Sequence, residues 1–494
     1  MKRSRWRLRY AAIAVAGCTA AATAPFGATM AQAGAPGPSV RLIAAQNTIT
    51  VERFGHRVFL DPGVYVESLG SPLQFNVQRA SYAKPITIAQ VIHLPGGGTE
   101  VRPFPASVLD GLNGLRNFVH ITVKNSNGTV KVSQQATFCP DVFDPQRATP
   151  GSPATSPFPQ SGCGFNPFQK SMVWGVQQGW GADPAEFSGQ AYRLRLGTYE
   201  VTVRITSKYR RLLDISAADA TAHVTAIVVK GTGCCVAPPR HHGASGTLPR
   251  LPKAANLQNP PRDALPDLVP APSWGIGATR LRATKSHHER DELNFGATVW
   301  IGGNSPLDVQ GFRSNGSPVM KAYQYFWRNG HVIGRARAGT MGFDTRNGHN
   351  HWHFEQFARY RLLDASKTVA VRSHKQGFCI APTDPMDLVP PHAVWQPSFT
   401  GFGGACGSPT ALWVQEMLPV GWGDTYFQFV AGQAFNITHL PNGTYYIEVT
   451  ANPGNVLHES DTGNDVSLRK VIIGGTRGHR TVRVPAFHGI DPEG

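Results

Sequence analysis

The strongest constraint on this fold is a set of four landmarks that occurs twice along the chain, in the same order. The pairs are Phe138-Cys139 and Phe378-Cys379, Gly179-Trp180-Gly181 and Gly421-Trp422-Gly423, Gly189-Gln190-Ala191-Tyr192 and Gly432-Gln433-Ala434-Phe435, and Gly197-Thr198-Tyr199-Glu200-Val201 and Gly443-Thr444-Tyr445-Tyr446-Ile447. The separation from cysteine to tryptophan is 180 − 139 = 41 residues in the first half and 422 − 379 = 43 in the second. The matching order and spacing indicate a divergent duplication, with chance similarity between two glycine-rich halves as the alternative.

Each half is predicted to fold as an all-β unit. The 494 residues include 53 Gly and 39 Pro, and the apolar runs are short, rich in Val, Ile, Thr and Tyr, and bounded by turn signals such as Pro441-Asn442-Gly443. This pattern is typical of antiparallel β-sandwiches of the immunoglobulin type. We therefore predict two related sandwich domains at residues 40–231 and 265–475, joined by a Pro-rich linker at 232–264 and followed by a tail at 476–494.

Residues 1–33 have the features of an export signal. Five basic residues within the first nine precede an Ala-rich apolar run, and Ala31-Gln32-Ala33 forms a cleavage site of the A-x-A type. The stretch Val15-Ala16-Gly17-Cys18 also resembles a lipobox, so a lipid anchor at Cys18 is the alternative to a freely secreted form. No later segment approaches the roughly 20 apolar residues that span a bilayer. We predict a secreted protein without a transmembrane span.

The charge of the chain narrows its partners. The formal net charge of +16 becomes 16 − 5 = +11 once the leader, which carries five basic and no acidic residues, is removed. A basic exported protein tends to bind anionic polymers such as those of a cell surface, although a generally basic surface that aids solubility explains the charge equally well. The sequence has no basic amphipathic helix and no basic cluster interleaved with aromatic residues, so nucleic acid is not an expected partner.

Six cysteines follow the leader, and four of them occupy corresponding places in the two halves. The predicted disulfides are Cys139 with Cys163 and Cys379 with Cys406. In an oxidising compartment each would close a loop worth roughly 3 to 4 kcal/mol. Cys234 and Cys235 are adjacent in the linker, and a vicinal bond, an intermolecular bond and free thiols all stay open for them.

The stretch Gly348-His349-Asn350-His351-Trp352-His353 is the most informative in the chain. In an extended segment the three imidazoles share one face, with successive Cα atoms about 6.6 Å apart and the outer pair about 13 Å apart, so some bending is needed for them to meet. Imidazole suits copper, zinc, iron and nickel, and three His without a fourth protein ligand leave positions open for water, oxygen or substrate. The pattern predicts a catalytic metal site at His349, His351 and His353 without choosing the metal.

Several further segments, in the right order, resemble the catalytic domain of lysyl oxidases. They are His349 to Phe357, Tyr360, Leu362-Leu363-Asp364-Ala365, His374-Lys375-Gln376-Gly377-Phe378-Cys379, Asp424-Thr425-Tyr426, Ile437-Thr438, Asn442-Gly443-Thr444-Tyr445, Asn452-Pro453 and Glu459-Ser460-Asp461 with Asn464, preceded by the opening Asp267-Leu268-Val269-Pro270. They are similar to the family's H-x-H-x-H copper motif, its F-x-x-Y-x-L-L-D-A and H-K-x-x-F-C segments and its D-T-Y segment. The resemblance covers roughly the whole second half.

The resemblance implies a copper amine oxidase with a built-in cofactor, lysine tyrosylquinone. Copper at the three histidines would help to oxidise Tyr426, and the amine of Lys375 would add to its ring. A quinone supplies the electron acceptor that free side chains lack. Asp424 matches an aspartate that is a candidate base in the family. The implied reaction converts primary amines, with peptidyl lysine favoured, to aldehydes with release of hydrogen peroxide and ammonia.

The sequence also departs from the family's animal members. Several of their cysteines are missing, and Cys379 and Cys406 match half-members of two different family disulfides. Paired with each other, they should hold Lys375 near the strand that carries Tyr426. The first half has Gln135 where the second has Lys375, relative to its cysteine, and no H-x-H-x-H motif, so we predict a non-catalytic lid, binding module or spacer.

Two other functions compete with the oxidase. One is a non-catalytic copper-binding or cell-surface binding protein of the same fold, and the other is a different three-His metalloenzyme, such as a zinc enzyme. Neither would require Lys375 and Tyr426 together. Because a basic oxidase repels a cationic amine, we expect an acidic patch near the site.

Overall fold

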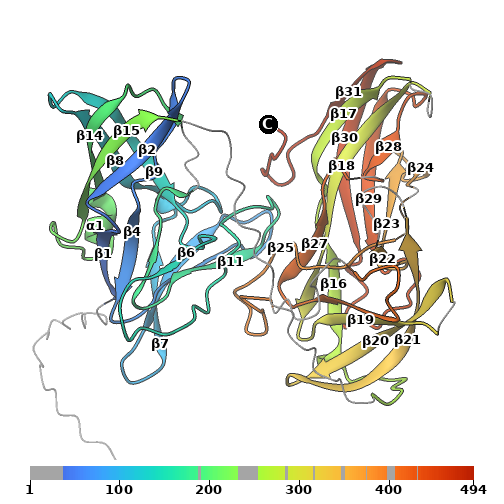
Figure 1. Cartoon of the computed structure of the whole chain (residues 1–494). Coiled ribbons are helices and arrows are strands. Elements are labelled where there is room, and N and C mark those ends of the chain that lie inside the picture. The colour runs from blue at the N-terminus through green and yellow to red at the C-terminus, as the bar shows by residue number, and fades with distance from the viewer. Residues whose placement is uncertain are drawn as a thin grey trace, which may run out of the picture. The chain divides into compact units, whose positions relative to one another are not determined.

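The computed structural model of the protein describes residues 37–186, 191–231, 254–283, 288–314, 317–345, 351–373, 375, 377–397, 406–430 and 432–494. The predicted export signal, Cys18, Cys234 and Cys235 lie outside these residues. The all-β prediction is confirmed, since sheets make up nearly all the regular structure (Figure 1) and the one α-helix of the described residues, α1 (Ser207–Leu212), is short. None of the described helices is long and apolar enough to cross a membrane.

The first half forms three sheets, here named N1, N2 and N3. N1 has the order β1 (Ser39–Ala44), β4 (Val64–Leu69), β12 (Trp180–Ala182) and β10 (Gln146–Arg147). N2 has the order β7 (Thr99–Phe104), β6 (Thr87–His93), β5 (Leu73–Gln78) and β11 (Ser171–Val176). N3 has the order β13 (Ala191–Tyr192), β3 (Arg57–Phe59), β2 (Thr48–Phe54), β15 (Thr221–Lys230), β14 (Gly197–Ile205), β8 (Leu115–Asn125) and β9 (Val130–Phe138).

The second half also forms three sheets, here named C1, C2 and C3. C1 has the order β16 (Pro266–Pro270), β18 (Arg290–Gly303), β27 (Trp422–Tyr426) and β25 (Asp384–Pro385), and β17 (Trp274–Leu281) and β28 (Ala434–Asn436) also pair with β18. C2 has the order β22 (His351–Phe354), β21 (His331–Asp344), β20 (Val319–Arg328), β19 (Leu307–Phe312) and β26 (Trp413–Leu418). C3 has the order β24 (Val369–Arg372), β23 (Ala358–Leu363), β29 (Gly443–Ala451), β30 (Val466–Thr476) and β31 (His479–Arg483).

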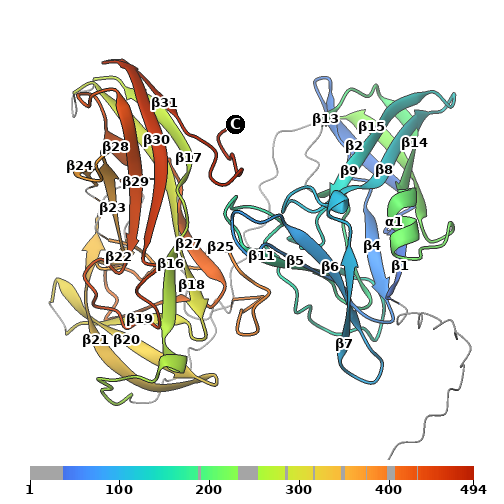
Figure 2. The same ribbon diagram turned by 180° about the vertical axis from the view of Figure 1, so that it is seen from behind.

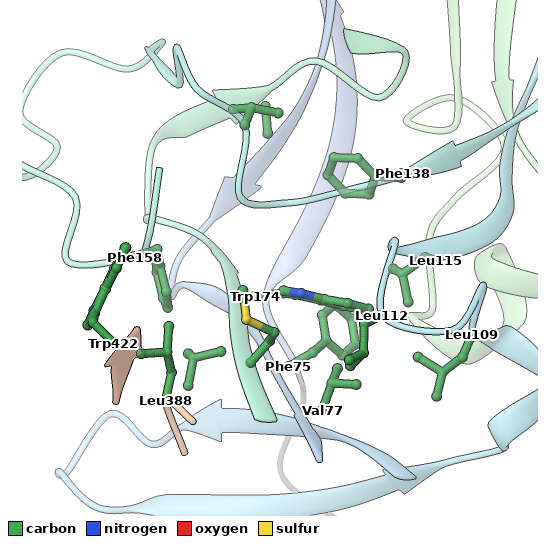
Figure 3. Packing of buried hydrophobic residues seen from close by; sticks show 14 of the residues in the cluster. Phe75, Val77, Leu109, Leu112, Leu115, Phe138, Phe158, Trp174, Leu388 and Trp422 are labelled. Carbon is green, nitrogen blue, oxygen red and sulfur yellow. The ribbon is translucent and has the colours of Figure 1, made fainter. Parts of the chain in front are cut away.

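Alternating burial explains why these segments form strands. In β14 the side chains of Tyr199, Val201, Val203 and Ile205 are buried while most residues between them face outward, which is the two-residue period of a sheet with one face on a core. Trp174 of β11 is the largest fully buried side chain of the first half, and it packs beside Phe75 and Leu112 (Figure 3).

A tyrosine corner recurs in both halves. The hydroxyl of Tyr199 donates to the carbonyl oxygen of Arg195 at 3.0 Å, and the hydroxyl of Tyr445 donates to the carbonyl oxygen of Pro441 at 2.9 Å. Each bond reaches four residues upstream, as in immunoglobulin-type sandwiches. The strands of N1 follow the same order as those of C1, and the strands of N2 follow the same order as those of C2. These matching orders and the two tyrosine corners support the predicted relation between the halves.

Three details differ from the simplest expectation. β2 and β15 pair in parallel, although the remaining ladders are antiparallel. The end of the predicted linker packs on the second half, since the backbone of Leu257 donates to the carbonyl oxygen of Arg335 at 2.8 Å. The predicted tail contains β31, which pairs with β30 (Figure 2), and Glu493, which accepts a hydrogen bond from Arg469. The domain boundaries themselves stay predictions.

A buried polar side chain of the first half, that of Asn166, contacts two residues of C1. The side-chain amide of Asn166 donates to Thr298 at 2.9 Å and to Asp384 at 3.0 Å. Thr298 in turn shares a 2.6 Å hydrogen bond with Thr425. Thr425 lies between two predicted site residues, so this network fixes the backbone of the strand that carries them.

Candidate active site

The edge strand β22 carries two of the three predicted metal ligands. His351 and His353 lie two residues apart and therefore share a face. Their ring centroids are 4.7 Å apart at an interplanar angle of 67°. His349 lies outside the described residues. Within the described residues, no group of three His, Cys, Asp or Glu side chains is positioned to hold a metal ion.

The outer edge of β22 is held by two segments that a disulfide joins. Phe354 exchanges backbone hydrogen bonds of 2.9 and 3.0 Å with Phe378, and the amide of Trp352 donates to the carbonyl oxygen of Cys406 at 3.0 Å. Cys406 is bonded to Cys379, as predicted. The disulfide therefore fastens both segments alongside the histidine strand. The second predicted disulfide, in the first half, also forms.

Asp344 lies opposite the histidines across the β21–β22 hairpin. It is the Cα partner of His351, and one of its carboxylate oxygens is 3.5 Å from Nδ1 of His353. A carboxylate at the ring nitrogen of a metal-ligating histidine orients the ring and fixes its tautomer. Sequence reasoning missed Asp344, and only the register of the hairpin could have pointed to it.

Lys375 and Tyr426 meet in the interior. Lys375 follows β24 and is 6% exposed, and Nζ lies 4.1 Å from the centroid of the Tyr426 ring. The Tyr426 ring packs edge-on against Phe378, with centroids 5.2 Å apart. Its hydroxyl accepts from the amide of Cys379 at 2.9 Å and donates to the carbonyl oxygen of the same residue at 3.1 Å. The ring is thus fixed in position and orientation.

Two glycines let the Lys375 segment pack closely. A Cβ on Gly377 would lie 2.7 Å from Cβ and 2.9 Å from Nδ1 of His353, so the segment runs directly against the histidine. A Cβ on Gly432, which has φ +88°, would lie 3.1 Å from Cβ of Lys375. Larger residues at either position would displace the lysine or the histidine.

Asp424 is buried on β27, two residues before Tyr426. One of its carboxylate oxygens has no hydrogen-bond partner among the described residues. Burial raises the pKa of Asp424 well above its usual range, whereas the charge of Lys375 lowers it. A carboxylate with a raised pKa and an oxygen left open for a proton can act as a general base.

A second buried carboxylate lies in the same interior. Glu416 on β26 is fully buried; one of its oxygens accepts from the amide of Ile380 at 3.1 Å, and the other has no partner among the described residues. Burial raises the pKa of Glu416 well above its usual range. Burial also raises the pKa of the Tyr426 phenol, with the negative field of Asp424 and Glu416 adding to the shift. Sequence reasoning missed Glu416, because it lies in an ordinary alternating strand.

The expected acidic patch is not found in the cavity beside Lys375. Among the described residues, three arginines and one glutamate line this cavity of about 400 Å³. Three carboxylates, Asp344, Asp424 and Glu416, lie elsewhere around the site, so the expectation of acidic residues near it stays a prediction.

Comparison with known proteins identifies relatives of the second half. Residues 317–479 match the sequence model of the family described as Lysyl oxidase. Lysyl oxidase homolog 2 of Gallus gallus is 29% identical over 139 residues, which are 28% of this chain and 16% of the relative. Lysyl oxidase homolog 1 of Homo sapiens is 26% identical over 212 residues, which are 41% of this chain and 32% of the relative. The chain thus spans less than a third of the length of either relative.

Proposed function

We propose that this protein, whose residues 317–479 match the lysyl oxidase family model, is a secreted, copper-dependent amine oxidase. Its cofactor would be lysine tyrosylquinone, formed from Lys375 and Tyr426. The reaction would convert a primary amine, dioxygen and water into an aldehyde, hydrogen peroxide and ammonia. The observation that carries the proposal is the buried lysine amine lying 4.1 Å from the ring centroid of a tyrosine.

The donor set of β22 fits copper. Neutral imidazole is a good ligand for Cu(II), and His351 and His353 present their rings on one face. His349 would be the third ligand, and Asp344 would orient His353. Bound copper supplies the one-electron chemistry with dioxygen that oxidises the phenol, and the resulting quinone supplies the acceptor for the electrons of the amine.

The protein's own side chains position the cofactor residues and move protons. The backbone of Cys379 fixes the Tyr426 hydroxyl, and Phe378 fixes its ring. Asp424 would accept a proton from the ammonium of Lys375, which must be neutral to act as a nucleophile, and the electrostatic interaction between the two groups supports this role. Burial of these groups excludes water and strengthens their mutual electrostatic interactions.

Asp424 would also act as the base during turnover. A base must remove a proton from the carbon next to the substrate nitrogen, and the open carboxylate oxygen of Asp424 lies in this interior. The partners would be primary amines, with lysine side chains of an extracellular protein favoured. The basic surface would add affinity for an anionic cell-surface polymer, and secretion would follow from the leader, with Cys18 as a lipid anchor in the alternative form.

Quinone staining tests the proposal. The exported protein, expressed with copper, should stain in a quinone redox assay and release peroxide when a primary amine is added. Lys375→Ala and Tyr426→Phe should abolish both signals. A matched control exists in the same half, where Nζ of Lys367 lies 3.2 Å from the ring centroid of Tyr446. Lys367→Gln and Tyr446→Phe should leave both signals unchanged.

Two outcomes would favour the competing functions. A wild-type protein that binds copper at His351 and His353 without staining would be a non-catalytic copper-binding or surface-binding protein. A protein that retains zinc in preference to copper and hydrolyses substrate would be another three-His metalloenzyme. Metal analysis of the wild type and of His351→Ala separates these cases, because the variant should lose the metal in all of them and the metal's identity decides.

A further inference from the structure

An arginine pocket lies beside Lys375. Arg359, Arg361 and Arg372 line this cavity of about 400 Å³, together with Lys375. Arg361 and Arg372 are Cα partners across β23 and β24, and Arg359 lies two residues along β23, so the three arginines share one face of C3. Three guanidinium groups from two neighbouring strands therefore converge next to the proposed cofactor.

Only one of these arginines is neutralised within the described residues. Arg361 forms a bidentate pair with Glu448, with N to O distances of 2.5 and 2.8 Å. No described carboxylate lies within ion-pair distance of Arg359 or Arg372. Nε of Arg359 is buried and has no hydrogen-bond partner among the described residues. Burial, followed by the charge of Arg361, lowers the pKa of Arg359.

This charge opposes the substrate that a simple amine oxidase would take. A protonated alkylamine or diamine in the pocket would lie among the cations that line it beside Lys375, and like charges at short range repel. The one lining carboxylate that the structure describes, Glu355, accepts a hydrogen bond from Thr340 at 2.9 Å and is outnumbered by the lining cations, so the lining keeps a net positive charge. The pocket is thus built to hold an anion, because the fork of an arginine matches a carboxylate or phosphate.

We infer that the arginine pocket binds an anionic group of the substrate, so that the enzyme selects primary amines whose own molecule carries a carboxylate or similar anion. This inference rests on the proposed oxidase function and specifies its substrate class. The anion would dock on Arg359 and Arg372 while the amine reaches the cofactor. Such an amine comes either from a free ω-amino acid or from a peptide lysine flanked by acidic residues.

Steady-state kinetics test the selection. Amine-dependent peroxide release is measured with ε-aminohexanoate, hexylamine and diaminohexane, and with lysine peptides flanked by Glu or by Gln. We expect kcat/KM for the anionic amine to exceed that for hexylamine by roughly ten-fold, the equivalent of one charge-assisted hydrogen bond. Diaminohexane should be the poorest substrate. The two anionic arms show whether a free amino acid or a peptide is the better source.

Variants assign the selection to the pocket. In the double variant Arg359→Gln/Arg372→Gln the ratio of kcat/KM for ε-aminohexanoate over hexylamine should fall to near one. The matched control is Arg483→Gln, an exposed arginine on β31 at the opposite edge of C3, which should keep the wild-type ratio. Equal rates for the anionic and neutral amines in the wild type, or a preference for the diamine, would overturn the inference.

A binding measurement separates this inference from the oxidase proposal. Hexanoate binding does not need a mature quinone, so calorimetric titration should show binding to the wild type and to Arg483→Gln, and at least ten-fold weaker binding to the double variant. A stained, amine-oxidising protein that does not bind hexanoate refutes the pocket alone. A protein that binds hexanoate through these arginines but never stains refutes the oxidase and leaves an anion-binding site.

Discussion

The two halves of this protein share their order of strands but differ in the side chains that they bury at equivalent positions. β12 and β27 occupy the same place in N1 and C1, and each follows a glycine with positive φ. Ala182 on β12 pairs with Val66, and Asp424 at the equivalent place on β27 pairs with Val299. A small apolar side chain in the first half is thus replaced by a buried carboxylate in the second.

A second apolar residue of the first half corresponds to a buried carboxylate when N2 is compared with C2. Trp174 pairs with Phe75 two residues before the end of β11, and Glu416 pairs with Val309 two residues before the end of β26. Trp174 fills the core of its half (Figure 3), whereas Glu416 brings a carboxylate to the side of Tyr426. Burying a charged group is costly, and these two buried carboxylates lie beside Lys375 and Tyr426, which agrees with the proposal that the chemistry takes place in the second half.

Besides these side-chain differences, the two halves differ in the length or presence of two strands. C2 has an edge strand, β22, beyond β21, and N2 has no described strand beyond β7. In the first half β9 continues to Phe138, with a shift of its register against β8 between Ala136 and Phe138, and Gln135 is exposed on it. In the second half β24 ends at Arg372, and the chain turns Lys375 into the interior. If the halves arose by duplication as predicted, one added strand and one shortened strand distinguish the half that carries the proposed site.

Converting Asp424 to the residue of the first half should have the largest effect. Loss of a general base costs about 10² to 10⁴ in rate, so Asp424→Ala should lower kcat/KM, expressed per quinone that stains, by that factor, and quinone formation should also slow because Lys375 loses its proton acceptor. Burial raises the pKa of Asp424, so wild-type kcat/KM should rise with pH as this carboxyl loses its proton, and the variant should lose that limb of the profile.

The control for this prediction is the reverse change. Ala182→Asp in the first half should leave kcat/KM and its pH profile unaltered, because no lysine or tyrosine of the site lies there. An Asp424→Ala protein that stains and keeps more than half of the wild-type kcat/KM would assign the base to another group, with Glu416 the next candidate.

The two disulfides should separate stability from chemistry. Their loops have sequence separations of 24 and 27 residues, so removing either should lower the free energy of unfolding by about 3 to 4 kcal/mol. Only the Cys379→Ser/Cys406→Ser variant should also lose copper and stain, because its bond fastens the segments beside β22. Denaturant unfolding and metal analysis of both double variants make the comparison. Equal copper retention would contradict the bracing role.

A raised pKa alone should not make a site, and Asp183 tests this. Burial raises the pKa of Asp183, the residue after Ala182, to about 7. Because the folded state holds this proton more tightly than the unfolded state, its contribution to stability is present below pH 4 and is lost as pH rises to about 7.

The substitution Asp183→Asn removes that loss. The amide keeps an oxygen for the amide of Ala185, which now donates at 2.8 Å. The variant should gain about 1 to 2 kcal/mol over the wild type between pH 4 and pH 8, a figure reduced for partial exposure, with unchanged amine oxidation. Thermal unfolding at several pH values measures this, and a constant difference across the range would contradict it.

The sequence predicted what depends on pattern and spacing. Alternating residues gave the sandwich class, and matching positions gave both disulfides. The resemblance of ordered motifs identified Lys375 and Tyr426 as candidate site residues, and in the structure they lie in contact. The site residues that the sequence did not predict are brought into place by the register between strands that are distant in the chain. Asp344 faces His353 only through a hairpin, Glu416 reaches Tyr426 from another sheet, and the arginines converge from two strands.

The smallest expected effect concerns the tyrosine corners, the feature that the two halves share most closely. Tyr199→Phe removes a hydroxyl that donates to the carbonyl oxygen of Arg195 at 3.0 Å and accepts from its amide at 3.1 Å, and Tyr445→Phe removes a hydroxyl that donates to Pro441 at 2.9 Å. Each should lower the free energy of unfolding by about 1 kcal/mol, with the larger loss at Tyr199, whose hydroxyl makes two of these bonds. Neither should alter staining, since both corners lie outside the proposed machinery. A fall in the free energy of unfolding at one corner alone would show that the two halves no longer depend equally on this contact. If only Tyr199→Phe lowered it, the second sandwich would rely more on the disulfide and backbone hydrogen bonds beside β22.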